Sequence, residues 1–154
     1  MNDELEIDNL DMRIITALQQ DSRKPFQEIA RDLEVSGGTV HVRFNKLKDG
    51  GVIKGSHVQI DYGKLGYDVT AFIGINLHNA GDYQTVLAKL RDMKEIVEVH
   101  YTTGSYSMFI RVITKSTEGL HTFLTQKLQP LKEIQSTETF ISLDIPVKRD
   151  VSLI

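Results

Sequence analysis

The side chains that could carry out catalysis or bind a metal are scattered along this sequence. None of the histidines has a partner at metal-ligand spacing; they are His41, His57, His78, His100 and His121. The sequence contains no HExxH, GxSxG or P-loop motif. Ser105 and Ser107 lie near His100, but no acid–base pair is indicated that would activate a nucleophile. We therefore expect no catalytic residue, no metal site and no cofactor, and we do not expect an enzyme.

A polar turn from Thr102 to Ser107 is more informative. Its sequence, Thr-Thr-Gly-Ser-Tyr-Ser, gathers hydroxyl groups beside a glycine that leaves backbone N–H groups accessible. Such a turn can hold a carboxylate through its main-chain donors, or it can be a polar hairpin without a ligand. The residues alone leave these two alternatives open.

Charge is distributed unevenly along the 154 residues, whose net charge is −3. Residues 1–35 carry a net charge of −5, residues 36–60 carry +3, and residues 61–154 carry −1. The overall acidity argues at first against nucleic-acid binding. The basic segment, however, could form a local positive face for DNA or be an ordinary solvated helix face.

Composition excludes several classes of protein. The hydrophobic fraction of 40% and the charged fraction of 25% are those of a globular chain, and the absence of cysteine excludes disulfide frameworks and thiolate–metal sites. The first six residues are acidic, unlike the start of a signal peptide, and no stretch reaches the ~18 apolar residues of a membrane span. We expect a soluble, cytoplasmic protein.

The first sixty residues predict three helices. Asp8 caps a helix over residues 9–20, in which Leu10, Ile14 and Leu18 share one face. Pro25 suits the first position of a second helix. A third helix begins after Ser36 as N-cap and ends at Gly50-Gly51; Val40, Phe44 and Leu47 form its inner stripe.

Two short connections complete this N-terminal region. The residues on either side of Lys54-Gly55-Ser56-His57 alternate in the manner of a β-hairpin, or wing, over residues 52–60. The turn between the second and third helices contains Glu34 at a position where such turns often need a positive φ angle. A non-glycine residue in that conformation is strained by about 1 kcal/mol or more, and the alternative is a slightly different turn that avoids the strain.

This order predicts a winged helix-turn-helix, whose second helix lies in the DNA major groove. Thr39, His41 and Asn45 are the expected base contacts, whereas Arg43 and Lys46 are expected at phosphates. Arg23 and Lys24 would lie near the flanking DNA backbone. The complete predicted DNA-binding set is Arg23, Lys24, Ser36, Gly37, Gly38, Thr39, His41, Val42, Arg43, Asn45 and Lys46. The alternative is a three-helix core without a DNA role.

The C-terminal half predicts a βαββαβ sandwich. Residues 69–77 alternate with period two, and residues 96–103 and 106–115 form two more strands joined at Gly104-Ser105. Gly81-Asp82 opens one helix, Ser116 caps another, and residues 134–145 form the last strand. The result is an α+β chain with a ferredoxin-like, four-stranded antiparallel sheet that has both helices on one face. The other face would expose Phe72, so we expect two copies to pair face to face.

Several segments carry a resemblance to a known family. Ser36-(x3)-Val40-(x2)-Arg43-Phe44-(x2)-Leu47-(x3)-Gly51-Val52-Ile53 resembles the DNA-binding domain of the Lrp/AsnC (feast/famine) transcription regulators. Residues 64–68 (KLGYD), 101–104 (YTTG) and 134–139 (IQSTET) are similar to AsnC-like members, so the resemblance covers essentially the whole chain. It implies a helix-turn-helix domain over residues 1–61, a linker over 62–66, and an effector-binding and oligomerisation domain over 67–154.

The resemblance also implies an amino-acid effector site between dimers. By position it nominates Thr103, Gly104, Tyr106 and Ser107, with Gln135, Thr137 and Thr139 contributed by a neighbouring subunit. Lrp-like members usually have Asp where this chain has Ser107. An uncharged serine and the Gln135 amide suit a polar, neutral side chain, so asparagine is the favoured effector, and leucine, another amino acid or none remains possible.

The implied function is a sequence-specific, DNA-binding transcription regulator of amino-acid metabolism. Its partners would be a pseudo-palindromic operator in double-stranded DNA, the amino acid, and further copies of the chain, as a homodimer assembling to an octamer. Two alternatives are a nucleoid-like architectural protein without an effector and an amino-acid-binding sensor module without specific DNA binding. No membrane partner is expected.

Overall fold

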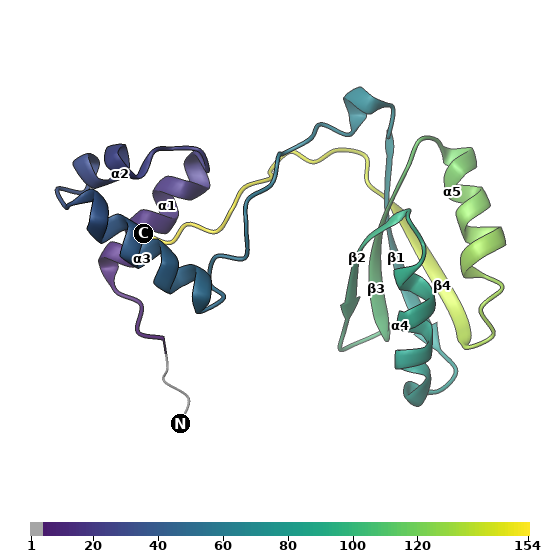
Figure 1. Cartoon of the computed structure of the whole chain (residues 1–154). Coiled ribbons are helices and arrows are strands. Elements are labelled where there is room, and N and C mark those ends of the chain that lie inside the picture. The colour runs from purple at the N-terminus through teal and green to yellow at the C-terminus, as the bar shows by residue number, and fades with distance from the viewer. Residues whose placement is uncertain (1–4) are drawn as a thin grey trace. The chain divides into compact units, whose positions relative to one another are not determined.

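The computed structural model describes residues 5–154, so the first four residues of the acidic N-terminal stretch lie outside the described part. Two compact units can be separated (Figure 1). The first extends to Gln59 and includes Val147–Ile154, and the second is Ile60–Pro146. Among the described residues, no helix is long and apolar enough to cross a membrane.

Three helices form the first unit: α1 (Asn9–Gln20), α2 (Phe26–Asp32) and α3 (Gly37–Asp49). The predicted limits of α1 and α3 are therefore confirmed, whereas α2 begins at Phe26, one residue after the predicted start, with Pro25 as its N-cap. Asp8 and Asp11 form a capping box at the start of α1. The buried core of the unit contains one residue of α1, two of α2 and one of α3, namely Ile14, Ile29, Ala30 and Val40.

The turn between α2 and α3 has the predicted strained residue. Glu34 has φ 58°, and it is the one non-glycine residue with positive φ among residues 5–154. The Val35 N–H donates to the Ala30 carbonyl at 2.9 Å, as in a Schellman motif, where glycine usually occupies the left-handed position. Val35 consequently packs against the core of the unit. The tight turn between the two helices thus requires a residue with a side chain, Glu34, to adopt an unfavourable backbone conformation.

Glu34→Gly should therefore stabilise the first unit. Removing the Cβ relieves about 1 kcal/mol of strain, part of which is offset by the greater flexibility of glycine in the unfolded chain. Thermal unfolding followed by circular dichroism measures the change. The matched control is Glu28→Gly in the exposed face of α2, which should cost about 1 kcal/mol. Equal destabilisation by both substitutions would contradict the assignment of strain to Glu34.

The predicted wing is wrong for this chain. Residues 52–60 contain no strand and are extended and largely exposed. An isolated two-stranded hairpin is marginally stable in water, and Val58 and Ile60 remain exposed. The alternating residues therefore form an extended segment, and they do not pair as the two strands of a hairpin.

The second unit is a four-stranded antiparallel sheet with the order β2-β3-β1-β4, as predicted for a ferredoxin-like sandwich. Its strands are β1 (Val69–Leu77), β2 (Ile96–Tyr101), β3 (Met108–Thr114) and β4 (Ile134–Ile141). The helices α4 (Tyr83–Arg91) and α5 (Thr117–Phe123) accompany the sheet (Figure 1). A π-helical segment, Leu124–Leu128, continues α5. The shared core unites alternate residues of β1 and β3 with both helices, which therefore cover one face.

The last strand is shorter than predicted. β4 ends at Ile141 and not at residue 145, and one further bond to β1 follows it, from the Ser142 N–H to the Thr70 carbonyl at 2.8 Å. The chain then runs without regular structure to its C-terminus. Val147–Ile154 groups with the first unit, whereas the sequence assigned those residues to the second.

The face of the sheet that the helices leave open is rich in aromatic side chains. The Phe109 ring lies at centroid distances of 6.2 Å from Phe72, 6.0 Å from Tyr106 and 6.4 Å from Phe140. Around them, Arg111 donates to Glu98 at 2.6 Å, and this hydrogen bond lowers the pKa of Glu98. An aromatic surface of this kind is unusual on a monomer that faces water.

Candidate DNA-binding and effector sites

The outward face of α3 carries the side chains predicted to read DNA bases. Val42 is 66% exposed, and His41 and Asn45 are also exposed. The Asn45 side-chain amide lies 3.2 Å from His41 Nδ1, so the two polar side chains form a pair one helical turn apart. Donors and acceptors on one exposed helix face suit base edges in a major groove.

The start of α3 is shaped by a serine cap and two glycines. Ser36 Oγ accepts from the Thr39 N–H at 3.0 Å and also lies 2.8 Å from the Thr39 hydroxyl. A Cβ on Gly37 would come within 2.5 Å of the Gln27 amide nitrogen, so glycine here permits close packing against α2. Gly38 is not crowded in this way, since its Cβ would meet only Ser36 Oγ, at 3.7 Å. The exposed backbone at Gly38 is thus the part of this terminus left free to approach a phosphate.

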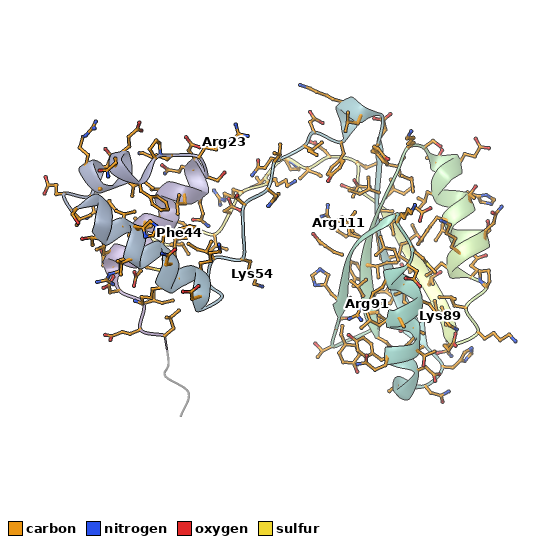
Figure 2. The ribbon with its side chains drawn as sticks, in the orientation of Figure 1. Arg23, Phe44, Lys54, Lys89, Arg91 and Arg111 are labelled. Atoms are coloured by element: carbon orange, nitrogen blue, oxygen red, sulfur yellow. The ribbon has the colours of Figure 1, made fainter. Side chains whose placement is uncertain are left out.

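The predicted phosphate-binding cations have different surroundings. Arg23 is exposed between α1 and α2 (Figure 2), whereas Lys24 pairs with Asp32 at 2.5 Å. That hydrogen bond raises the pKa of Lys24. Arg43 and Lys46 both contact the carboxylate of Asp11, at 3.2 and 2.7 Å. Three of the four cations therefore already have anionic partners within the protein.

The Thr102–Ser107 turn joins β2 to β3 and is closed at both ends. The Thr102 N–H donates to the Ser107 carbonyl at 3.2 Å, and the Thr102 hydroxyl donates to the Tyr106 carbonyl at 2.8 Å. Gly104 adopts φ 102°, which a side chain would disfavour. The backbone N–H groups of residues 103–106 have no hydrogen-bond partner among the described residues. The turn therefore offers free main-chain donors of the kind that hold a carboxylate.

Tyr106 connects this turn to the last strand across β1. Its hydroxyl donates to the Glu138 carboxylate, and this bond raises the pKa of Tyr106. The ring lies on the Cα of Gly74, where an added Cβ would meet ring atoms at 2.6 Å. Gly74 pairs with Glu138 in the register of β1 and β4. Because Gly74 has no side chain, the Tyr106 ring can cross β1 and reach Glu138 on β4.

The remaining effector candidates lie on β4 in two different environments. Thr137 pairs with Ile75 and Thr139 with Ile73, so both threonines are on the helix-covered side and half-buried. Gln135 is exposed at the irregularity where the β1–β4 register shifts. Ser107 contacts β1 from the other side: its N–H donates to the Ile75 carbonyl at 2.9 Å. Within one chain, then, β1 separates the turn from these β4 side chains.

Sequence reasoning missed Gly74 and Glu138. Both alternate with buried neighbours and so belong to the open face, but no nearby sequence pattern indicated that the Tyr106 ring would contact them. Among residues 5–154, no group of three or more potential ligands could hold a metal ion.

Comparison with known proteins accounts for both halves of the chain. Residues 7–48 match the AsnC-type helix-turn-helix domain, and residues 70–152 match the Lrp/AsnC ligand binding domain. The chain belongs to the Lrp/AsnC family. Members of this family combine DNA-binding and ligand-binding domains as the two units here do, and the chain is a helix-turn-helix transcription regulator.

Curated Lrp/AsnC relatives support the same assignment over nearly the full length. Regulatory protein AsnC of Haemophilus influenzae is 50% identical over 145 residues, which cover 94% of this chain and 97% of the relative. Regulatory protein AsnC of Escherichia coli K12 is 46% identical, covering 94% and 95%. The transcriptional regulator FL11 of Pyrococcus furiosus is 37% identical, covering 90% and 91%. These relatives are named as regulators, which implies a non-enzymatic role.

Solved structures confirm the fold of the Lrp/AsnC family in this chain. The structure of Escherichia coli AsnC matches with a TM-score of 0.92 at 45% identity, covering 96% of this chain and 99% of that one. A regulator from Neisseria meningitidis in complex with L-Met matches with a TM-score of 0.88 at 18% identity, covering 96% of each chain, and shows the fold alone.

Proposed function

We propose that this regulator controls genes of amino-acid metabolism in the cytoplasm and responds to an amino acid, with asparagine as the favoured effector. The observation that supports an effector is the row of free backbone N–H groups at residues 103–106 beside the positive-φ Gly104. Such donors suit the carboxylate that every amino acid carries. The uncharged hydroxyl of Ser107 and the exposed amide of Gln135 favour a polar, neutral side chain.

The effector would complete its site between subunits. In one chain β1 lies between the turn and the candidates on β4, namely Gln135, Thr137 and Thr139. A neighbouring chain can place its own β4 next to the turn, and the effector would then bind between two dimers. The aromatic open face supports pairing of two copies, and the association of four such dimers would give an octamer. An amino acid bound there changes DNA binding only by favouring one assembly or geometry over another.

DNA recognition is proposed through the exposed face of α3. Alanine replacements of Thr39, His41 and Asn45 should each lower the affinity for a selected operator about 5- to 150-fold, because a good base contact contributes about 1–3 kcal/mol. The operator is obtained by selection from a random-sequence duplex pool, and affinities are measured by fluorescence anisotropy. The control is Gln126→Ala, an exposed change in the second unit. An unchanged ratio of selected to random-duplex affinity in all three variants would instead favour the architectural alternative.

Calorimetry against each of the twenty amino acids, with and without the selected operator, tests the effector proposal. Asparagine should give heat of binding, and its affinity should change when operator is present, because the coupling between two ligands is reciprocal. No heat with any amino acid would contradict the effector proposal while leaving DNA binding intact. Binding of an amino acid without selectivity for any duplex would support the sensor-module alternative.

A further inference from the structure

A buried carboxylate connects the first turn of α1 to α3. The Asp11 side chain is 0% exposed, and its oxygens accept from Arg43 Nη1 at 3.2 and 3.3 Å and from Lys46 Nζ at 2.7 Å. It also accepts from the Asp8 N–H at 3.1 Å in the capping box. Lys46 donates in addition to the Glu6 carbonyl, and Arg43 pairs with Asp8 at 2.5 Å. We call Asp8, Asp11, Arg43 and Lys46 the α1–α3 charge cluster.

The cluster lies away from the DNA-reading side of α3. At about 100° per residue, Gly38, His41, Val42 and Asn45 share one side, whereas Lys46 lies about 90° and Arg43 about 150° from its centre. Both cationic side chains are 30% exposed, against 0% for Asp11. Their stems therefore run along the helix surface toward α1 and not outward with His41 and Asn45.

Electrostatic attraction to Asp11 keeps both cations in the cluster. A carboxylate without access to water is costly unless its charge is balanced and hydrogen-bonded, and here the two cations and one backbone N–H supply that balance. The hydrogen bond to Asp8 raises the pKa of Arg43, in keeping with a strong pair. Moving either cation to a DNA phosphate would leave Asp11 buried with less compensation.

We propose that Asp11 is a positioning residue for DNA binding: together with Asp8 it balances the charges of Arg43 and Lys46 within the protein and keeps both from serving as phosphate contacts. It fixes α3 against α1 and so sets which charges of the domain meet the DNA. This proposal rests on DNA binding by α3. It replaces the phosphate-contact role that the sequence suggested for Arg43 and Lys46.

Phosphate binding then falls to cations outside the cluster. Arg23, Lys48 and Lys54 are exposed and take part in no ion pair among residues 5–154. Lys48 is the matched control for Lys46, since both belong to the last turns of α3 and differ in whether an internal carboxylate holds them. Lys54 follows the helix and is visible in Figure 2.

The salt dependence of DNA binding tests the proposal, because each phosphate contact adds about 0.9 to the slope of log affinity against log salt concentration. The probe is a mixed-sequence 40-base-pair duplex, titrated by anisotropy with the full chain from 50 to 200 mM KCl. Lys46→Gln should leave the slope unchanged and lower the melting temperature. Asp11→Asn should steepen the slope by about 0.9 for each bound chain, because Lys46 loses its carboxylate partner and is released to a phosphate, whereas Asp8 still holds Arg43.

Lys48→Gln provides the opposite control. It should reduce the slope by about 0.9 for each bound chain while leaving the melting temperature unchanged. A loss of that size in Lys46→Gln without loss of stability would overturn the proposal, as would an unchanged slope in a folded Asp11→Asn protein. If Asp11→Asn does not fold, Arg43→Gln provides the same comparison as Lys46→Gln. Failure of the unsubstituted chain to bind any duplex would contradict DNA binding itself, which is a different result.

Discussion

Replacing Gly74 with alanine should displace Tyr106, destabilise the second unit by about 1–3 kcal/mol, and weaken effector binding at least about tenfold. The new Cβ would overlap ring atoms that now lie at 2.6 Å, and these belong to the rigid ring of a side chain tied to Glu138. Because Tyr106 belongs to the turn that carries the free N–H donors, its displacement changes the shape of the proposed carboxylate site. Thermal unfolding and calorimetry with asparagine measure the two effects.

The double variant Gly74→Ala/Tyr106→Ala separates this mechanism from a general weakening of β1. Removing the ring makes room for the Cβ, so the two substitutions should be strongly non-additive in stability. Gly119→Ala is the matched control, because its Cβ would be only in ordinary contact, 3.5 Å from Thr114. Simple additivity in the double variant would show that the ring is not what the Cβ meets.

Phe140→Asp should dissociate the proposed dimer. Phe140 is 44% exposed beside Phe109 on the open face, so its replacement disturbs the folded chain little. In a two-fold interface each substitution occurs twice, and two charges would be buried without partners. We expect monomers in sedimentation velocity at micromolar concentration, and an operator affinity at least about 100-fold lower, because the second recognition helix is no longer tethered.

Gln126→Asp adds the same charge at an exposed position of the π-helical segment that continues α5, which does not belong to the open face. It should leave both the sedimentation and the operator affinity unchanged. If Phe140→Asp sediments like the unsubstituted protein, the copies associate through another surface and the open face needs a different explanation.

Elements governed by local rules were predictable from the sequence. Asp8, Ser36 and Ser116 cap helices where expected, because a side-chain oxygen next to free N–H groups acts within one turn of chain. The limits of α1 and β1 followed from periods of 3.6 and 2. The positive φ of Glu34 was one of two alternatives that the sequence left open, since a slightly different turn would have avoided it.

Features that depend on distant partners were not predictable. Asp11 is separated from Lys46 by 35 residues, and Tyr106 from Glu138 by 32, so no spacing rule joins them. The predicted wing failed although it was local, since residues 52–60 have the alternation of strands but form no strand. The candidate base-contacting residues were easier to nominate because they lie within one helix.

The surface that α3 is proposed to present to DNA is small and has no wing beside it, which limits how much sequence one chain can specify. Contacts from a few side chains of one helix define about four base pairs, a combination that recurs by chance roughly once in 250 positions. A genome offers about 10⁶–10⁹ competing positions, so one domain alone would be bound at thousands of them. Two domains together contact about eight base pairs, and a given eight-base-pair sequence recurs roughly once in 65,000 positions, so it is still not unique in a genome. The specificity needed to find one promoter therefore depends on how many copies bind DNA together. An effector that changes their assembly would change the length of DNA sequence that the regulator can recognise.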